Sequence, residues 1–189
     1  MGRSWIIFGI GIIAILAAGP LPAKEIDLST RSDPDAEFDV AFCARPSLGA
    51  TGKPGHAFVA FSKKPHNAQR DFLAIGHTIS ATESAISAAW SYFGEPVSGL
   101  LKEELYTSVE QDCLVVAVNK EDYETARRLT ESPLSQMGLA APDMPVFQAY
   151  GLGEQDCMTF MIDVATVLAS RGLKIPARQA TERAIAESW

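Results

Sequence analysis

The chain has 189 residues, of which 47% are hydrophobic and 21% are charged, and its formal net charge is −7. This length and composition suit one globular domain with accessory segments. The acidic balance comes without a basic patch, so we expect no nucleic-acid partner.

The N-terminus has the pattern of a secretory signal peptide. One cation, Arg3, precedes an uncharged apolar run from Ile6 to Ala18, and Gly19 to Ala23 contains two prolines. The run is too short to span a bilayer comfortably. We expect cleavage after Ala23, with cleavage after Ala18 and an uncleaved membrane anchor as the alternatives. Residues 1–23 are therefore expected to be removed from an exported protein, periplasmic or extracellular, that keeps no stable membrane span.

Residues 24–36 are polar and are expected to form a flexible lead-in to a single domain at 37–189. Alternating or short apolar runs predict strands, and the strands expected are Glu37–Ala44, Gly55–Phe61, Asp71–Ile79 and Val109–Asn119. The second and third strands form a hairpin through the polar connection Lys63–Gln69.

Helical patterns and turn residues fill the rest of the domain. The helices expected are a short one at Thr82–Phe93, one at Lys120–Ser132, one beginning near Cys157 and a surface helix at Ala177–Trp189. Gly94–Gly99 is expected to be a turn or loop, and Ser80–Glu104 as a whole could serve as a lid. Strands with an intervening helix, followed by a further helix, predict an α+β domain.

The expected export of the protein affects how the three cysteines are interpreted. An odd number in an oxidising compartment leaves at least one thiol unpaired. Cys43 ends one strand-like stretch and Cys113 opens another, and two strands of one sheet can bring such residues into bridging range. A Cys43–Cys113 disulfide would leave Cys157 free, and three free thiols are the alternative.

Cys157 lies at the start of an amphipathic helix. Asp156 or Gln155 can cap its N-terminus, and Gly172 is a natural residue for its C-terminal end. The positive end of a helix dipole favours thiolate over thiol, which makes Cys157 a candidate nucleophile. A small buried cysteine is the structural alternative.

A cysteine nucleophile needs an imidazole within reach and a group that orients the imidazole. His56 and His77 lie on the two strands of the predicted hairpin, each after a glycine, and both have a structural histidine as the alternative. His66 lies in the polar connection and is expected to be exposed. The chain has no HExxH or CxxC motif and no ligand spacing among its histidines, so no metal or other cofactor is expected.

Two motifs resemble the circularly permuted papain-like fold, a group related to the NlpC/P60 peptidases that includes the lecithin retinol acyltransferase relatives. They are Gly55-His-Ala-Phe-Val-Ala-Phe61 and, about a hundred residues later, Tyr150-Gly-Leu-Gly-Glu-Gln-Asp-Cys-Met-Thr-Phe160. In permuted members the histidine strand precedes the cysteine helix, and a tyrosine seven residues before the cysteine is a further shared feature. Val118–Glu124 also resembles the strand-to-helix link of bacterial members. The resemblance covers Phe38 to Pro176.

The resemblance implies an antiparallel sheet packed against a cysteine-bearing helix, with Cys157 as nucleophile and His56 as general base. His77 is similar to a second histidine of some members, and Tyr150 would help to polarise the substrate carbonyl, with a core aromatic as the alternative. The implied function is an exported cysteine hydrolase that cleaves an amide bond, with a cell-wall peptide as the suggested substrate. The alternatives are a non-catalytic periplasmic binding module on the same scaffold and a lipid acyltransferase, so the expected partner is a peptide or acyl substrate.

Overall fold

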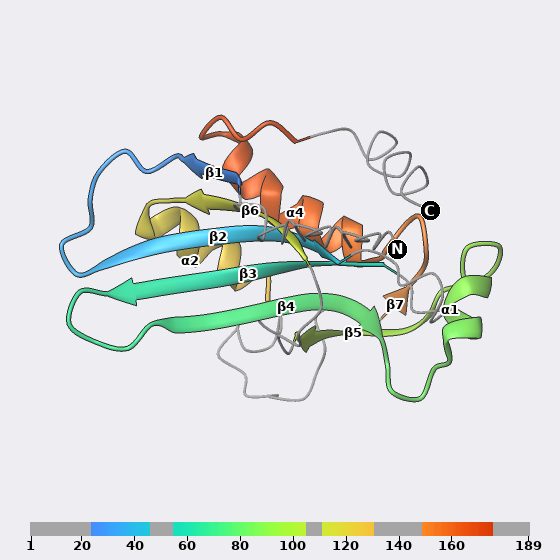
Figure 1. Ribbon diagram of the computed structural model, residues 1–189. Coiled ribbons are helices and arrows are strands. Elements are labelled where there is room, and N and C mark those ends of the chain that lie inside the picture. Colours follow the sequence, from blue (N-terminus) through green and yellow to red (C-terminus); the bar gives the residue numbers. More distant parts are fainter. Residues whose placement is uncertain (1–23, 46–54, 105–110, 131–148, 176–189) are drawn as a thin grey trace, which may run out of the picture.

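The computed structural model describes residues 24–45, 55–104, 111–130 and 149–175 (Figure 1). The predicted signal peptide at 1–23 and the predicted surface helix at 177–189 lie outside these residues. The described part is a mixed α+β structure with one seven-stranded sheet. Its strands are β1 (Lys24–Asp27), β2 (Ala36–Arg45), β3 (His56–Pro65), β4 (Asp71–Ile79), β5 (Val97–Glu103), β6 (Asp112–Ala117) and β7 (Ala149–Tyr150). Its helices are α1 (Ala85–Trp90), α2 (Lys120–Arg128) and α4 (Cys157–Ala169).

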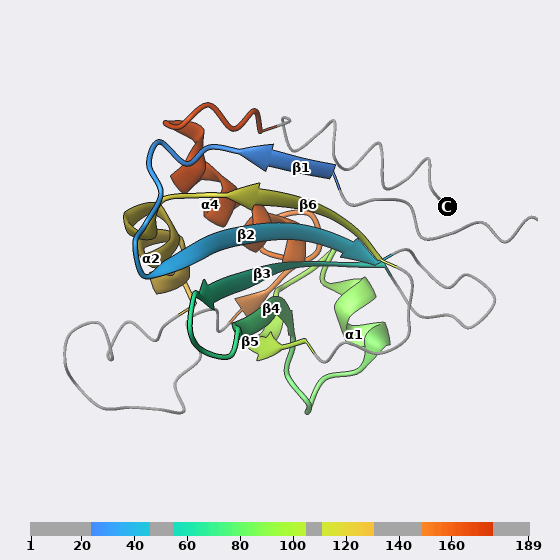
Figure 2. The ribbon, with the colours of Figure 1, turned by 60° about the vertical axis from the view of Figure 1, so that its left-hand side comes forward.

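The sheet is antiparallel except at one edge. Its strand order is β1-β6-β2-β3-β4-β5-β7, and the edge strand β1 runs parallel to β6. Figure 2 shows β1 and β6 at one side of the sheet and β5 at the other. Neighbouring strands from β2 to β5 are close in sequence, so their pairing follows from hairpin connections. None of the described helices is long and apolar enough to cross a membrane.

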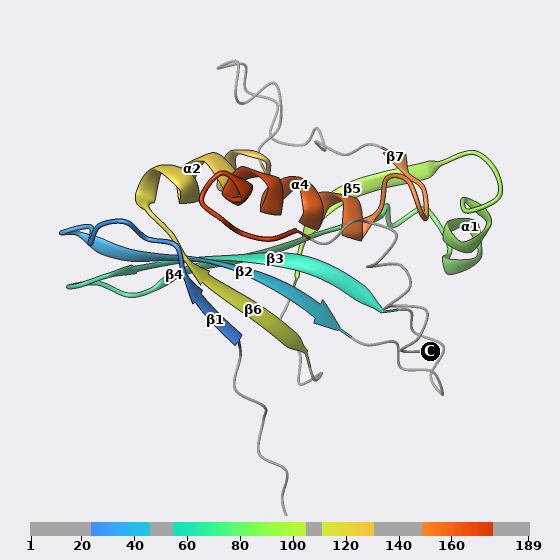
Figure 3. The same ribbon diagram turned by 90° about the horizontal axis from the view of Figure 1, so that it is seen from above.

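Helices α2 and α4 cover one face of this sheet (Figure 3). Helix α4 packs on β3 and β4 and against α2. Alternate side chains of the strands point to this face, because successive residues of a strand face opposite ways. Complete burial of a single aliphatic or aromatic side chain stabilises the fold by about 1.5–3 kcal/mol. The core between sheet and helices includes the fully buried Val40, Val59, Phe61, Val116, Phe160, Val164 and Leu168.

The prediction that residues 24–36 form a flexible lead-in needs a correction. Lys24–Asp27 forms β1, which pairs with β6 from Lys24↔Leu114 to Asp27↔Ala117. The Thr30 N–H then donates to Asn119 Oδ1 over 3.1 Å. The segment is polar and mostly exposed, as expected of an edge strand. Its partner lies far away in the chain, so no local pattern indicates the pairing.

A second correction concerns the segment after α1. Gly94–Gly99 was expected to be a turn or loop, but β5 begins at Val97 and pairs with β4 from Ile79↔Gly99 to Ile75↔Glu103. Pro96 and Gly99 predict a turn, and the residues after them do not alternate between apolar and polar side chains, so the sequence does not indicate this strand. The segment Ser80–Glu104 therefore consists of a connection that contains α1, followed by β5, which pairs antiparallel with β4.

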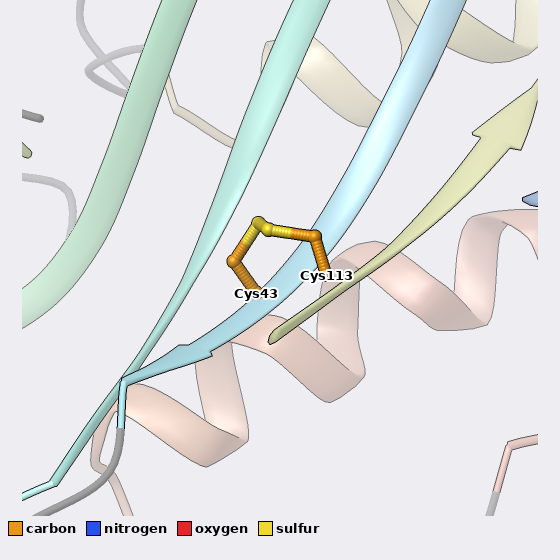
Figure 4. The surroundings of a disulfide bond; sticks show 2 residues. All are labelled: Cys43 and Cys113. Atoms are coloured by element: carbon orange, nitrogen blue, oxygen red, sulfur yellow. A yellow bond between two sulfur atoms is a disulfide. The ribbon is translucent and has the colours of Figure 1, made fainter. Parts of the chain in front are cut away.

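The disulfide forms between Cys43 of β2 and Cys113 of β6 (Figure 4). The two residues are direct cross-strand partners with a Cα–Cα distance of 4.2 Å. This is the pairing that the two strand-like stretches suggested, and Cys157 is the free cysteine. The bridge spans a sequence separation of 70, and closing a loop of that size in the unfolded chain is worth about 4 kcal/mol in the chain-entropy account.

Candidate active site

Cys157 is the first residue of α4, and the N-cap of that helix is Asp156. The Asp156 carboxylate accepts hydrogen bonds from the N–H groups of Met158 (3.0 Å) and Thr159 (3.1 Å). The Thr159 hydroxyl in turn accepts from the Asp156 N–H, which completes a capping box. Asp156 thus satisfies backbone donors that the first helical turn would otherwise leave without partners. The result is a fixed helix start that holds the Cys157 side chain half-buried.

A tight turn leads into this helix. Gly153 has a φ of 87°, which glycine adopts without a steric penalty. Its N–H donates to Asp156 Oδ2 over 2.9 Å, and the Gly151 N–H donates to the Gln155 carbonyl over 2.9 Å. The turn and the helix cap therefore share Asp156, so the backbone on both sides of Cys157 is held by the same carboxylate.

His56 begins β3 and is the cross-strand partner of Arg45 in β2. Its Nε2 lies 2.8 Å from Glu104 Oε1, and the Cys157 thiol interacts with the same ring. Burial alone would lower the pKa of His56, but Cys157 and Glu104 together raise that pKa from 6.5 to about 9. The imidazole is therefore held as imidazolium at neutral pH, between a thiol and a carboxylate.

Glu104 is the functional residue that sequence reasoning missed. It lies just after β5, and its N–H donates to the Ala74 carbonyl over 2.9 Å, which fixes its backbone beside β4. The hydrogen bond to His56 lowers the pKa of the Glu104 carboxyl, and Arg45, with Nη1 3.7 Å from Oε2, lowers it further against the effect of burial. In the sequence, Glu104 ends a charged run of three residues that resembles a solvated surface. A prediction that β5 pairs with β4 would have placed Glu104 near His56.

Gly76 of β4 leaves the space in which His56 and Glu104 meet. A Cβ at this position would collide with His56 Nε2 and would lie 3.0 Å from Glu104 Oε1. The absence of a side chain at Gly76 thus has a steric reason. Arg45, His56 and Gly76 come from β2, β3 and β4, and Glu104 is the residue after β5.

His77 occupies a different place. Its side chain is fully buried, at 0% exposure, and interacts with backbone groups of Asp156 and Ala149. Its ring packs edge-on against Tyr150 with 5.2 Å between centroids. Burial lowers the pKa of His77, so the ring is neutral at physiological pH. A Cβ at Gly99 would come within 2.8 Å of His77 Nε2, so this glycine lets β5 pack closely on the ring. The partner that the structure places on His56 Nε2 is Glu104, and His77 supports the chain around the helix start.

Tyr150 in β7 is close to Cys157 and is also part of the core. Its side chain is buried and interacts with the Cys157 thiol. Burial raises the pKa of the Tyr150 hydroxyl, and the interactions with Cys157 and Asp156 raise it further. The phenol therefore keeps its proton and can donate it to a hydrogen bond. The burial agrees with the core aromatic expected as the alternative, and the role of Tyr150 at a substrate carbonyl stays a prediction.

Neither family models, nor curated proteins, nor solved structures gave a match to this chain. Four residues form the candidate site: Cys157, His56, Glu104 and Tyr150. His66 is exposed, as expected, and lies outside this group. Within the ranges that the structure describes, no three His, Cys, Asp or Glu side chains are grouped so that they could share a metal ion. A thiol, an imidazole and a carboxylate in series can carry out nucleophilic acyl transfer.

Proposed function

We propose that the protein is an exported cysteine hydrolase with a permuted papain-like fold, which cleaves an amide bond through an acyl-enzyme. The observation that carries this proposal is the position of His56, with the Cys157 thiol and the Glu104 carboxylate both on its ring. The order of the parts supports the fold assignment, because the histidine strand β3 precedes the cysteine helix α4 and the helix packs on the sheet.

The reaction begins with Cys157 as thiolate and His56 as imidazolium. The sulfur attacks the substrate carbonyl carbon, and the carbonyl π electrons move onto the oxygen. Collapse of this intermediate breaks the C–N bond while His56 gives its proton to the leaving amine. Water then attacks the thioester carbonyl carbon, and His56 takes a proton from this water. The C–S bond breaks, which releases a carboxylic acid and restores the thiolate.

Two groups stabilise the negative oxygen of the intermediates. One is the Cys157 N–H at the positive end of α4, and the other is the Tyr150 hydroxyl, whose raised pKa keeps it protonated. Glu104 holds the His56 ring and favours its charged form. Arg45 keeps Glu104 ionised from its other oxygen. Each described member of the group thus has a separate role.

The disulfide supports export, because such bonds persist in oxidising compartments. It also leaves one free cysteine, at the start of α4 and partly exposed. A bridged or fully buried Cys157 would have favoured a non-catalytic binding module, so the observed state favours the enzyme. The cell-wall peptide substrate rests on the family resemblance together with the apolar N-terminal run.

The test combines thiol labelling with hydrolysis of peptide amides, including cell-wall peptides. We expect iodoacetamide to modify Cys157 and to abolish hydrolysis, since Cys43 and Cys113 are bridged. Cys157→Ser should lower kcat/KM by at least about 10³-fold, because the nucleophile is lost. Peptide mapping of the labelled protein identifies the modified residue. Full hydrolysis by Cys157→Ser would refute the mechanism.

A further inference from the structure

Large apolar side chains are exposed on α1 and the turn after it. Ile86, Trp90, Tyr92 and Phe93 are 70%, 67%, 63% and 79% exposed, and helix α1 itself buries no residue. Among the described residues, the remaining exposed large hydrophobic side chain is Phe72 on β4. A contiguous apolar cluster on a protein surface marks an interaction site, whereas single exposed side chains are ordinary.

Trp90 and Phe93 of this cluster line a groove of ≈ 420 Å³. Phe93 packs edge-on against Tyr92 (4.9 Å between centroids) and against Trp90 (6.4 Å). Trp90, Phe93 and Val97 give the groove an apolar lining. Glu95 is its one charged lining residue, and the stretch from Asp71 to Leu101 contains no Lys or Arg. Such a groove suits an uncharged apolar group and disfavours an anion.

Short contacts connect the groove to the turn before the nucleophile. The Leu152 N–H donates to Ser91 Oγ over 3.2 Å, and a Cβ at Gly153 would lie 3.3 Å from the Tyr92 ring. Val97, which lines the groove, is the cross-strand partner of Tyr150. Cross-strand neighbours have Cβ atoms roughly 5 Å apart, and the Tyr150 side chain itself contacts the Cys157 thiol. Figure 1 shows α1, β7 and the first turn of α4 at the same end of the sheet.

We propose that this groove is a substrate subsite for an uncharged hydrocarbon or aromatic group next to the scissile carbonyl. The inference deepens the proposed function and rests on it. One strand pairing separates the groove from the residue that contacts the nucleophile, so a substrate held at Cys157 has the groove within reach of its next group. The enzyme then selects substrates by an apolar group, which the hydrolase assignment alone does not specify.

The experiment uses two series of esters with the full-length protein, each rate normalised to hydroxide-catalysed hydrolysis. In the first series the acyl chain of p-nitrophenyl esters grows from acetyl to butyryl and hexanoyl. In the second the acyl group stays acetyl and a para-alkyl chain grows on the phenol. We expect kcat/KM to rise by roughly two- to fourfold per added methylene in one series, because burial of each CH₂ is favourable. The series that rises shows on which side of the carbonyl the group lies.

Substitutions of the lining residues test whether the rise in kcat/KM depends on the groove. Trp90→Ser and Phe93→Ser should flatten the rising series, so that the ratio of kcat/KM for the longest chain to kcat/KM for the shortest chain falls toward one. Phe72→Ser makes the same chemical change at the exposed aromatic residue of β4 and should keep the full rise. A rise that persists in both Trp90→Ser and Phe93→Ser contradicts the proposal.

Two further outcomes overturn the inference and leave the hydrolase standing. One is a flat response in both series while hydrolysis still depends on Cys157. The other is a flat response together with binding to phosphatidylcholine vesicles that Trp90→Ser abolishes, which would make the cluster a membrane contact. If no ester is hydrolysed in a Cys157-dependent way, the proposed function itself fails.

Discussion

At the scale of single residues, we expect the pH range of the proposed reaction to depend on Glu104. Its carboxylate lies 2.8 Å from His56 Nε2 and helps to raise the His56 pKa to about 9. The mechanism needs the imidazolium, which gives its proton to the leaving amine. Activity is therefore lost as the pH rises through the His56 pKa, and this alkaline limit should lie near pH 9 in the wild type.

Glu104→Gln keeps the shape of this side chain and removes its charge. The imidazolium then loses a stabilising partner, so we expect the His56 pKa and the alkaline limit of kcat/KM to fall by roughly one pH unit or more. The measurement is the profile of kcat/KM against pH for both proteins. Glu103→Gln removes the same charge from the exposed neighbour and should leave the profile in place. Equal shifts in the two variants would show that Glu104 acts only through net charge.

The residues of this site differ in how well the sequence reveals them. Cys157 follows a capping residue at the start of an amphipathic pattern, and His56 and Tyr150 lie in recognisable motifs, so local sequence predicts all three. Glu104 has no such context, because its strand carries no clean alternation and its role arises from pairing with β4. His77 was expected to assist catalysis, but its described contacts are with the backbone around the helix start and with Tyr150.

At the scale of elements, Asp156 couples the preceding turn to the start of α4. Asp156→Ala removes the acceptor for the N–H groups of Gly153, Met158 and Thr159. Loss of a helix cap costs about 1–2 kcal/mol, so the free energy of unfolding should fall by that amount in urea titrations. Hydrolysis should fall as well, because Cys157 is the first residue that the cap positions.

Asp156→Asn is the matched variant, because its amide oxygen can still accept from the N–H groups of Met158 and Thr159, while the Gly153 N–H, which donates to the other carboxylate oxygen, loses its acceptor. We expect it to retain most of the stability that Asp156→Ala loses. A stability equal to the wild type in Asp156→Ala would mean that the cap contributes nothing to the start of the helix. Equal losses in both variants would assign the effect to what asparagine lacks, the negative charge near the helix dipole and the acceptor for the Gly153 N–H.

The elements themselves follow from the sequence where they are local. The strand expected at Asp71–Ile79 has the bounds of β4, and Cys157 lies in the first turn of its helix, as predicted. The errors, at β1 and β5, concern strands near the edges of the sheet, which carry few buried side chains. Edge strands are defined by partners from elsewhere in the chain, and a polar segment such as Lys24–Asp27 contains no pattern that names its partner.

At the scale of the whole molecule, the order of strands and helices in the sequence predicted an α+β structure, and the described residues form one. Local sequence patterns do not predict that residues of β2 and β4 and the residue after β5 lie around His56 of β3. That convergence depends on the register between strands, from Arg45↔His56 in β2–β3 to Ile75↔Glu103 in β4–β5. A shift of one residue in either pair would turn His56 or Glu104 to the other face of the sheet.

The disulfide ties β2 to β6, its neighbour on the side away from β3, at Cys43, two residues before Arg45. In the double variant Cys43→Ser/Cys113→Ser, the unfolded chain regains the freedom of a loop that spans a sequence separation of 70. We expect the free energy of unfolding to fall by about 2–4 kcal/mol in urea titrations without reductant. The buried core between α4 and the sheet contains neither cysteine, so the variant should still fold.

Cys157→Ser, measured with and without reductant, is the control for this result. It has no thiol besides the bridged pair, so reductant should lower its stability by the same amount as the double variant loses. Iodoacetamide labelling of Cys157 in the folded double variant should proceed at the wild-type rate, since His56 and Glu104 keep their places. A double variant as stable as the wild type would show that the sheet holds its register through hydrogen bonds and packing alone. Labelling that slows while the fold persists would show that the bridge acts directly on the geometry of the site.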